Sequence, residues 1–314
     1  MSNKEKIKII FAGTPDFAIP SFQSLINENN FEILAVITQP DKKQGRKQIL
    51  SPTPVKITAE NYKIAVWQPE KIKEYEKEII KANPDLGVVI AYGQIIPQDI
   101  LDIPRYGWIN IHASLLPKYR GAACVQAAIL AGDQETGITI MKIDKGLDTG
   151  PILKQTKIKI NKEDTAETLS DKLAKLGAEI IVETLKNYIS GKIKPKNQSN
   201  SESTYVPTLS KADGKIDWQK NAEEIERMTR ALNPWPGTWT ELNGKKIKII
   251  SAFPNILKIN KYKIGETFLS DGKLAVQCGQ NALLIKRLQL EGKKETTAEE
   301  FLRGHKENIG QIFN

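Results

Sequence analysis

The first half of the chain takes its fold from the stretch Ile7-Lys8-Ile9-Ile10-Phe11-Ala12-Gly13-Thr14-Pro15-Asp16. Its largely apolar run does not alternate with polar residues, which is typical of a strand buried on both faces. The residues after the run predict the start of a helix, because Thr14 can cap it and Pro15 suits the first helical position. A buried strand followed at once by a helix predicts the beginning of a βαβ unit.

The same pattern continues through the first half of the sequence. Further strands are predicted at 33–38, 86–91, 108–111 and 138–143. Helices are predicted between and after them, at 15–29, 69–82, 122–131 and 165–189. Strands separated by helices of this length predict an α/β fold with a mostly parallel, doubly wound sheet.

The pattern changes after residue 189. Residues 190–207 lack periodicity and are rich in Ser, Lys, Asn and Pro, as a linker would be. Beyond them we expect one helix, capped at Asn221 with Glu224, and then short strands at 246–250, 256–259, 274–277 and 283–288. The sequence therefore predicts a first domain at 1–189, a linker at 190–207, and a small antiparallel β-barrel or sheet at 208–314.

Composition excludes several classes of protein. The chain has 314 residues, of which 40% are hydrophobic, so a disordered or fibrous protein is excluded. Its two cysteines, Cys124 and Cys278, stand at no metal-binding or redox spacing, which indicates a reducing compartment and no disulfide scaffold. No apolar stretch approaches the ~18 residues of a membrane span. We therefore expect a cytoplasmic protein, not associated with membranes, and a monomer.

The charge is positive, with 46 Lys and Arg against 37 Asp and Glu and a formal net charge of +9. A surplus of this size indicates an anionic partner, or it only reflects the basic pI that is common among the proteins of a Lys-rich proteome. Most of the surplus lies after residue 189. A second concentration lies in the loop 39–56, which contains Lys42, Lys43, Arg46 and Lys47. Such a loop is suited to phosphate contact, although a charge run is more often only a solvated surface.

Three polar residues could carry chemistry. Asn110 and His112 lie two residues apart at the end of a predicted strand, so both side chains point to one face. Asp148 lies in the glycine-flanked loop 146–150. Asn110 and His112 could donate hydrogen bonds to an oxyanion, while Asp148 orients His112 or helps to remove a proton from an attacking amine. This is acyl transfer without a covalent nucleophile or a metal; the plainer alternatives are a structural histidine and an ordinary turn.

At this point the sequence resembles a known family, the folate-dependent formyltransferases. The resemblance in the first half rests on Phe11 to Ala18, Thr38 to Asp41, Asn110 to Pro117, Tyr119 to Ala123 and Gly146 to Gly150. In the second half, Leu209 to Lys211, Ile216 to Trp218 and Arg230 to Gly237 resemble the members that act on tRNA. The resemblance implies a Rossmann-like catalytic domain and an OB-like β-barrel. It also implies transfer of a formyl group from 10-formyltetrahydrofolate to the α-amine of methionine on initiator tRNA.

The resemblance also implies site residues. Asn110, His112 and Asp148 match the family's catalytic positions. Folate contacts are implied for the segment after the strand at 108–111, namely Ser114, Leu115, Leu116 and Pro117. They are also implied for the apolar run that includes Val88, Ile90, Ala91 and Tyr92. The basic loop matches an insertion that reaches the tRNA acceptor end, with Arg46 at its most important arginine.

Three other functions compete with this prediction. A formyltransferase acting on a sugar nucleotide or another small amine would share Asn110, His112 and Asp148, but would not need the basic loop or a basic second domain. A non-catalytic RNA-binding protein would need only the basic second domain. A nicotinamide-dependent oxidoreductase lacks support, because Gly13-Thr14-Pro15 is not the GxGxxG fingerprint.

Overall fold

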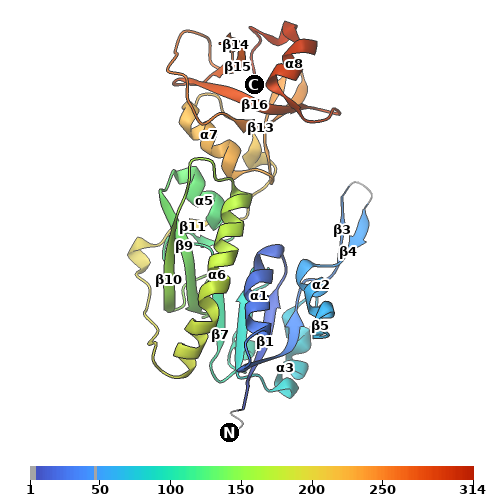
Figure 1. The fold of residues 1–314 in the computed structure, drawn as a ribbon, viewed down its shortest axis with the longest axis vertical. Coiled ribbons are helices and arrows are strands. Elements are labelled where there is room, and N and C mark those ends of the chain that lie inside the picture. Colours follow the sequence, from blue (N-terminus) through green and yellow to red (C-terminus); the bar gives the residue numbers. More distant parts are fainter. Residues whose placement is uncertain (1–4, 46–47) are drawn as a thin grey trace. The chain divides into compact units, whose positions relative to one another are not determined.

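The computed structural model describes residues 5–45 and 48–314, apart from the side chain of Gln44 (Figure 1). The chain divides into two compact units. The first comprises 1–121, 136–158 and 170–206, and the second comprises 122–135, 159–169 and 207–314. Within the described part of the chain, no helix is both long and apolar enough to cross a membrane.

The first unit is built on a mostly parallel sheet, as predicted. Its seven strands lie in the order β10-β9-β7-β6-β1-β2-β5; the pairs β7-β6, β6-β1, β1-β2 and β2-β5 are parallel, and β9 runs antiparallel to β7. The strands are β1 (Ile7–Gly13), β2 (Phe31–Ile37), β5 (Ala65–Trp67), β6 (Leu86–Ile90), β7 (Trp108–His112), β9 (Glu135–Lys142) and β10 (Ile152–Lys159). The central strand β6 is buried along its whole length, which explains its unbroken apolar sequence.

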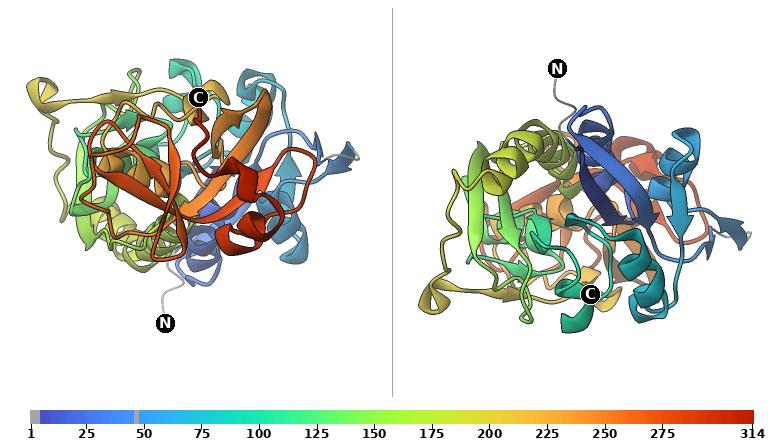
Figure 2. Two further views of the ribbon diagram at one scale, coloured as in Figure 1. Left: turned by 90° about the horizontal axis from the view of Figure 1, so that it is seen from above. Right: turned by 90° about the horizontal axis from the view of Figure 1, so that it is seen from below.

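Helices cover both faces of this sheet (Figure 2). Phe11 of β1 stacks on Phe22 of α1 (Ile19–Ile26), with the ring centroids 4.5 Å apart, and α6 (Ala166–Ile189) lies on the same face. The opposite face packs on α3 (Glu76–Ala82) and α4 (Gln98–Leu101). Two further helices are α2 (Pro54–Asn61) and α5 (Cys124–Ala131), the latter in the second unit.

The structure corrects two details near the first strand. The predicted cap at Thr14 is wrong, because its hydroxyl donates to the carbonyl oxygen of Tyr92 at 2.9 Å and so ties the end of β1 to the residues after β6. The helix expected at 15–29 is accordingly a 3₁₀ turn (Asp16–Ala18) followed by α1. Within 39–56, a hairpin of β3 (Lys42–Gln44) and β4 (Ile49–Ser51) is followed by α2, which Thr53 caps.

The second unit contains an antiparallel sheet. Its strands follow the order β12-β13-β16-β15-β14, with β17 paired to β16. They are β12 (Thr238–Leu242), β13 (Lys245–Ala252), β14 (Thr267–Ser270), β15 (Lys273–Gln277), β16 (Ala282–Leu290) and β17 (Thr296–Thr297). The predicted capping box of Asn221 and Glu224 is present and begins α7 (Ala222–Ala231).

The two edges of this second sheet are joined by residues 310–314. Phe313 donates to the carbonyl oxygen of Gly265 beside β14, and Asn314 exchanges two backbone hydrogen bonds with Glu241 of β12. Pairing both edges closes the sheet as a barrel is closed and removes exposed edges. The strand predicted at 256–259 is reduced to one isolated bridge at Leu257, whereas β12, β14 and α8 (Ala298–Gly304) were not predicted.

Candidate active site

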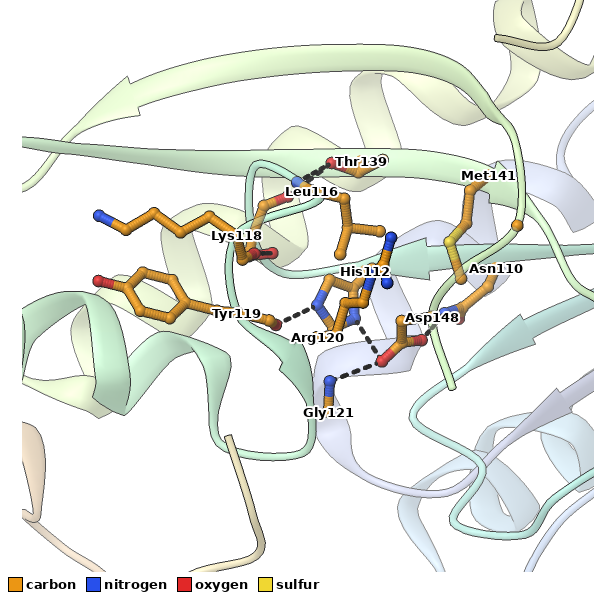
Figure 3. Close-up of polar contacts among 12 residues, drawn as sticks. Asn110, His112, Leu116, Lys118, Tyr119, Arg120, Gly121, Thr139, Met141 and Asp148 are labelled. Atoms are coloured by element: carbon orange, nitrogen blue, oxygen red, sulfur yellow. Dashed lines mark hydrogen bonds and ion pairs between the residues drawn. The ribbon is translucent and has the colours of Figure 1, made fainter. Parts of the chain in front are cut away.

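Asn110 and His112 lie at the carboxyl end of β7, where β6 pairs on one side and β9 on the other (Figure 3). Asn110 is opposite Met141 of β9, and His112 is opposite Thr139. Because side chains alternate along a strand, these two point to the same face. His112 is buried at 6% exposure, while Asn110 is partly exposed, so the pair lies at the boundary between core and solvent.

Asp148 connects the two strand residues. Its Oδ1 accepts from Asn110 Nδ2 at 3.4 Å, and its Oδ2 lies 3.6 Å from His112 Nδ1. Oδ2 also accepts the backbone N–H of Gly121 at 2.8 Å. The structure thus brings together the three residues predicted to carry chemistry, and it adds one backbone donor, the N–H of Gly121.

The hydrogen bonds of His112 define which nitrogen carries a proton. Its Nε2 lies 2.9 Å from the carbonyl oxygen of Tyr119. A carbonyl oxygen only accepts, so Nε2 is the donor in this contact. Nδ1 therefore faces Asp148, and it is the ring nitrogen that is available to interact with a substrate.

The backbone at position 121 requires a glycine. Its φ is +105°, and a Cβ at this position would lie 2.3 Å from the carbonyl oxygen of Val206. This close approach arises because β8 (Arg120–Gly121) pairs in parallel with β11 (Tyr205–Val206). The segment expected to be a linker therefore packs against the residues that support Asp148.

Side chains of β9 and β10 form hydrogen bonds to the segment that follows β7. Thr139 Oγ1 donates to the carbonyl oxygen of Ser114 at 2.6 Å and accepts the N–H of Leu116 at 3.1 Å. Gln155 Nε2 donates to the carbonyl oxygen of Leu116 at 2.7 Å. Ser114 and Leu116 are buried, and Leu115 and Pro117 are partly exposed, so these last two can offer side-chain surface to a ligand.

The apolar run of β6 lies mostly in the core. Val88, Ile90 and Tyr92 are each at most 1% exposed, whereas Ala91 is exposed and has a φ of +47°. Burial raises the pKa of the Tyr92 phenol, and its hydroxyl has no hydrogen-bond partner among the described residues. Of these four residues, Ala91 alone has a side chain open to solvent.

A cavity of about 510 Å³ lies beside the beginning of the loop that carries Asp148. Its wall contains apolar side chains and charged groups of both signs, from Gln98, Leu101, Asp102, Pro104, Arg105, Gly107, Lys142, Ile143, Asp144 and Lys145. Its volume suits a small organic ligand, for which pockets of ~300–1,000 Å³ are usual. No motif in the sequence indicated this cavity, because its wall comes from two segments that lie far apart in the chain, 98–107 and 142–145.

The basic loop projects from the first unit as the β3–β4 hairpin. Lys42 and Lys43 are exposed on β3, while the predicted tRNA contacts Arg46 and Lys47 lie outside the described residues. Ile49 and Leu50 on the facing strand are also exposed, at 61% and 62%. At the base of the hairpin, a hydrogen bond from Lys56 Nζ lowers the pKa of Asp41.

Comparison with known proteins agrees with this geometry. A family model for formyl transferase matches residues 5–185, and one for the formyl transferase C-terminal domain matches residues 208–306. The chain is 46% identical to a methionyl-tRNA formyltransferase of Caldanaerobacter subterraneus over 98% of this chain and 100% of that protein. It is 45% identical to another of Geobacter metallireducens, over 95% and 96%.

A solved structure has the same fold. It is an N-formyltransferase from Helicobacter canadensis in complex with folinic acid and dTDP-3-aminofucose, with a TM-score of 0.67 and 21% identity. The match covers 89% of this chain and 98% of that one. The family matches cover both halves of the sequence and include the segments that hold Asn110, His112 and Asp148. The chain therefore belongs to the formyl transferase family.

Proposed function

We propose that the protein transfers the formyl group of 10-formyltetrahydrofolate to the α-amine of methionine on initiator tRNA, producing N-formylmethionyl-tRNA for translation initiation. The observation that carries this proposal is the convergence of Asn110, His112 and Asp148 in a chain whose full length matches methionyl-tRNA formyltransferases. The protein would act as a monomer in the cytoplasm.

The proposed chemistry begins with attack of the neutral amine on the formyl carbon. One N–H of Asn110 is directed at Asp148, so its second N–H is free to donate to the oxyanion of the tetrahedral intermediate. His112 would donate from Nδ1, as an imidazolium, because Nε2 is already bonded to Tyr119. Asp148 would take up the proton of the attacking amine, directly or through water. The N10 of the folate then leaves with the electron pair of its bond to the formyl carbon and takes up the proton held by Asp148, which gives neutral tetrahydrofolate and restores the carboxylate.

For the folate we propose the cavity beside the Asp148 loop together with the segment after β7. The heterocycle would occupy the cavity between Leu101 and Ile143, where apolar walls and nearby polar groups coexist. Leu115, Pro117 and Ala91 would then be the predicted folate residues that contribute surface. Ser114, Leu116, Val88, Ile90 and Tyr92 would support the site from the core.

For the tRNA we propose the β3–β4 hairpin and the second domain. Lys42 and Lys43, with Arg46 and Lys47 beyond the described residues, would contact phosphates or bases of the acceptor end. Residues 1–189 would carry out formyl transfer, 190–207 would connect the domains, and 208–314 would bind tRNA. Arg46→Ala should raise the KM for the charged tRNA and weaken its salt dependence, because each lost phosphate contact lowers the slope by about 1. An unchanged KM and slope would exclude the hairpin.

The second candidate is formylation of an amino sugar attached to a nucleotide. It is favoured by the shared fold with the Helicobacter canadensis enzyme, in whose structure dTDP-3-aminofucose is bound. The two functions differ in the acceptor amine rather than in the chemistry of Asn110, His112 and Asp148.

The decisive experiment is incubation of the full chain with 10-formyltetrahydrofolate and one acceptor at a time. Methionyl initiator tRNA, methionyl elongator tRNA and dTDP-3-aminofucose are compared by the rate of formyl-product formation. We expect rapid formylation of the initiator tRNA and slow reaction with the other two. Preference for the amino sugar would support the second candidate, and no product with any acceptor would exclude both.

A further inference from the structure

The side chain of Gln198 lies between a buried arginine and the loop that carries Asp148. Its Oε1 accepts from Nε and Nη2 of Arg120, at 3.1 and 2.9 Å. Its Nε2 donates to the carbonyl oxygens of Asp148 and Gly150, at 2.9 and 2.7 Å. Both ends of one amide are therefore in use, one toward Arg120 and the other toward the backbone of the loop.

Arg120 is an unusual partner for this amide because it is 1% exposed. Its other acceptors are the hydroxyl of Tyr205 and Oδ1 of Asn200, at 3.0 Å each. These acceptors of Arg120, on Gln198, Asn200 and Tyr205, are all neutral groups. A buried cation polarises the groups that accept from it, so the N–H groups of Gln198 become better donors. The arginine also fixes which end of the amide faces the loop.

Asp148 needs such support from its surroundings. Its φ is +53°, in the left-handed region that non-glycine residues rarely adopt and that persists only where neighbours enforce it. Gln198 holds the main chain of Asp148, and the N–H of Gly121 holds its carboxylate. Gly121 belongs to β8, and Gln198 lies in the segment that precedes its partner strand β11. Removal of the Gln198 side chain would take away the two hydrogen bonds that hold the carbonyl oxygens of Asp148 and Gly150.

We propose that Gln198, oriented by Arg120, is a positioning residue for formyl transfer, which holds the Asp148 loop so that the carboxylate faces Asn110 and His112. This inference rests on the proposed function for its effect on turnover. Its structural part, the restraint of residues 144–150, is independent of the substrate. Gln198 does not touch the reacting atoms and acts only through Asp148.

The sharpest test is Gln198→Glu in the full chain. A carboxylate keeps, and strengthens, both hydrogen bonds from Arg120, but it cannot donate to the carbonyl oxygens of Asp148 and Gly150. If Gln198 served only to satisfy Arg120, this variant would be fully active. We expect instead that kcat falls about 10²-fold, as for a misplaced catalytic group, while the KM values for folate and tRNA change less than twofold. The pH profile of kcat should also move, because the Asp148–His112 pair is no longer held in place.

Two further variants complete the test. Gln198→Ala removes both sets of bonds and should lower kcat to a similar extent. Ser199→Ala is the matched control, because Ser199 is the exposed neighbour whose hydroxyl lies 2.9 Å from that of Ser201. It should leave kcat, its pH profile and the thermal midpoint unchanged.

Hydrogen exchange separates this inference from the proposed function. Amides of residues 144–150 should exchange faster in Gln198→Glu and Gln198→Ala than in the wild type and in Ser199→Ala, at equal global stability. Unchanged exchange, or wild-type kcat in Gln198→Glu, would overturn the inference. A wild-type protein that formylates no acceptor would instead refute the proposed function, while the exchange result would still decide whether Gln198 holds the loop.

Discussion

Two regions supply the proposed catalytic residues, and they hold them in different ways. Asn110 and His112 are placed by β7, which pairs with a neighbouring strand on each side. Asp148 is placed by an irregular loop and has a left-handed backbone conformation. Its two supports come from far along the chain, since Gly121 is 27 residues away and Gln198 is 50 residues away.

The strand residues are therefore oriented by local structure, and the loop residue is oriented by contacts that are distant in sequence. In the strand, the direction of Asn110 and His112 follows from the pleat and needs only the adjacent strands. In the loop, the direction of the Asp148 side chain depends on the N–H of Gly121 and the side chain of Gln198, which are distant in sequence. Substitutions on the strand should therefore remove chemistry while leaving the structure intact, and substitutions around the loop should disturb structure and chemistry together.

The largest effect is expected for Asn110→Ala. Loss of one oxyanion donor typically costs about 10²–10³ in turnover. The thermal midpoint should hardly change, because Asn110 is partly exposed and its side-chain hydrogen bond to Asp148 is long at 3.4 Å. Steady-state kinetics and thermal unfolding of the same preparation measure both quantities. Asn187→Ala, at another partly exposed asparagine, is the control and should retain full turnover. A large loss of stability in Asn110→Ala would contradict the idea that the strand positions its residues independently.

The next largest effect is expected for Gly121→Ala on the loop side. The new Cβ would meet the carbonyl oxygen of Val206 at 2.3 Å at a φ of +105°, so β8 must move. The expected cost is about 1–3 kcal/mol of unfolding free energy. Turnover should fall about tenfold or more, since the N–H donor to Asp148 moves with the backbone.

Gly191→Ala is a matched control for this substitution. Gly191 also has a positive φ, of +74°, but a Cβ there would have no atom within 4 Å. It should lose about 1 kcal/mol of stability and no activity. Equal turnover in the two glycine variants would show that Gly121 does not matter to Asp148.

The same contrast explains what could be predicted from the sequence. The alternating pattern of strands and helices predicted the parallel sheet, and the spacing of Asn110 and His112 predicted their common face. Asp148 was identified from its glycine-flanked loop. Each of these inferences depends on periodicity or on turn chemistry, which are local properties.

The supports of Asp148 could not be predicted in this way. Gln198 lies in a segment without periodicity, and such a composition favours a linker. Its contact with Arg120 joins residues 78 positions apart in the chain, and no local sequence pattern indicates such a contact. Thr14 failed as a cap for a related reason, because a contact with Tyr92, 78 residues away, uses its hydroxyl.

A moderate effect is expected for Thr139→Val, which removes a hydroxyl that links the strand region to the segment after β7. The hydroxyl is buried, donates to the carbonyl oxygen of Ser114 and accepts from Leu116. Its loss should cost about 1–3 kcal/mol, because a buried N–H and a carbonyl oxygen lose a partner. Denaturant unfolding measures the cost. The KM for folate should rise if Leu115 and Pro117 line the folate site, and an unchanged KM would place the folate elsewhere.

The smallest effect is expected for Tyr92→Phe, which tests whether a residue at the end of β6 acts through its side chain. Burial raises the pKa of the phenols of both Tyr92 and Tyr188, so both remain neutral at physiological pH. The Tyr188 hydroxyl donates to the carbonyl oxygen of Tyr106 at 3.1 Å, whereas the Tyr92 hydroxyl has no partner in the described part of the chain. Tyr188→Phe should therefore lose about 1 kcal/mol, while Tyr92→Phe should be neutral or gain a few tenths. A core role also predicts an unchanged KM for folate in Tyr92→Phe. A raised KM at unchanged stability would show instead that the hydroxyl reaches the folate, and the end of β6 would then present a side chain to substrate as the end of β7 does.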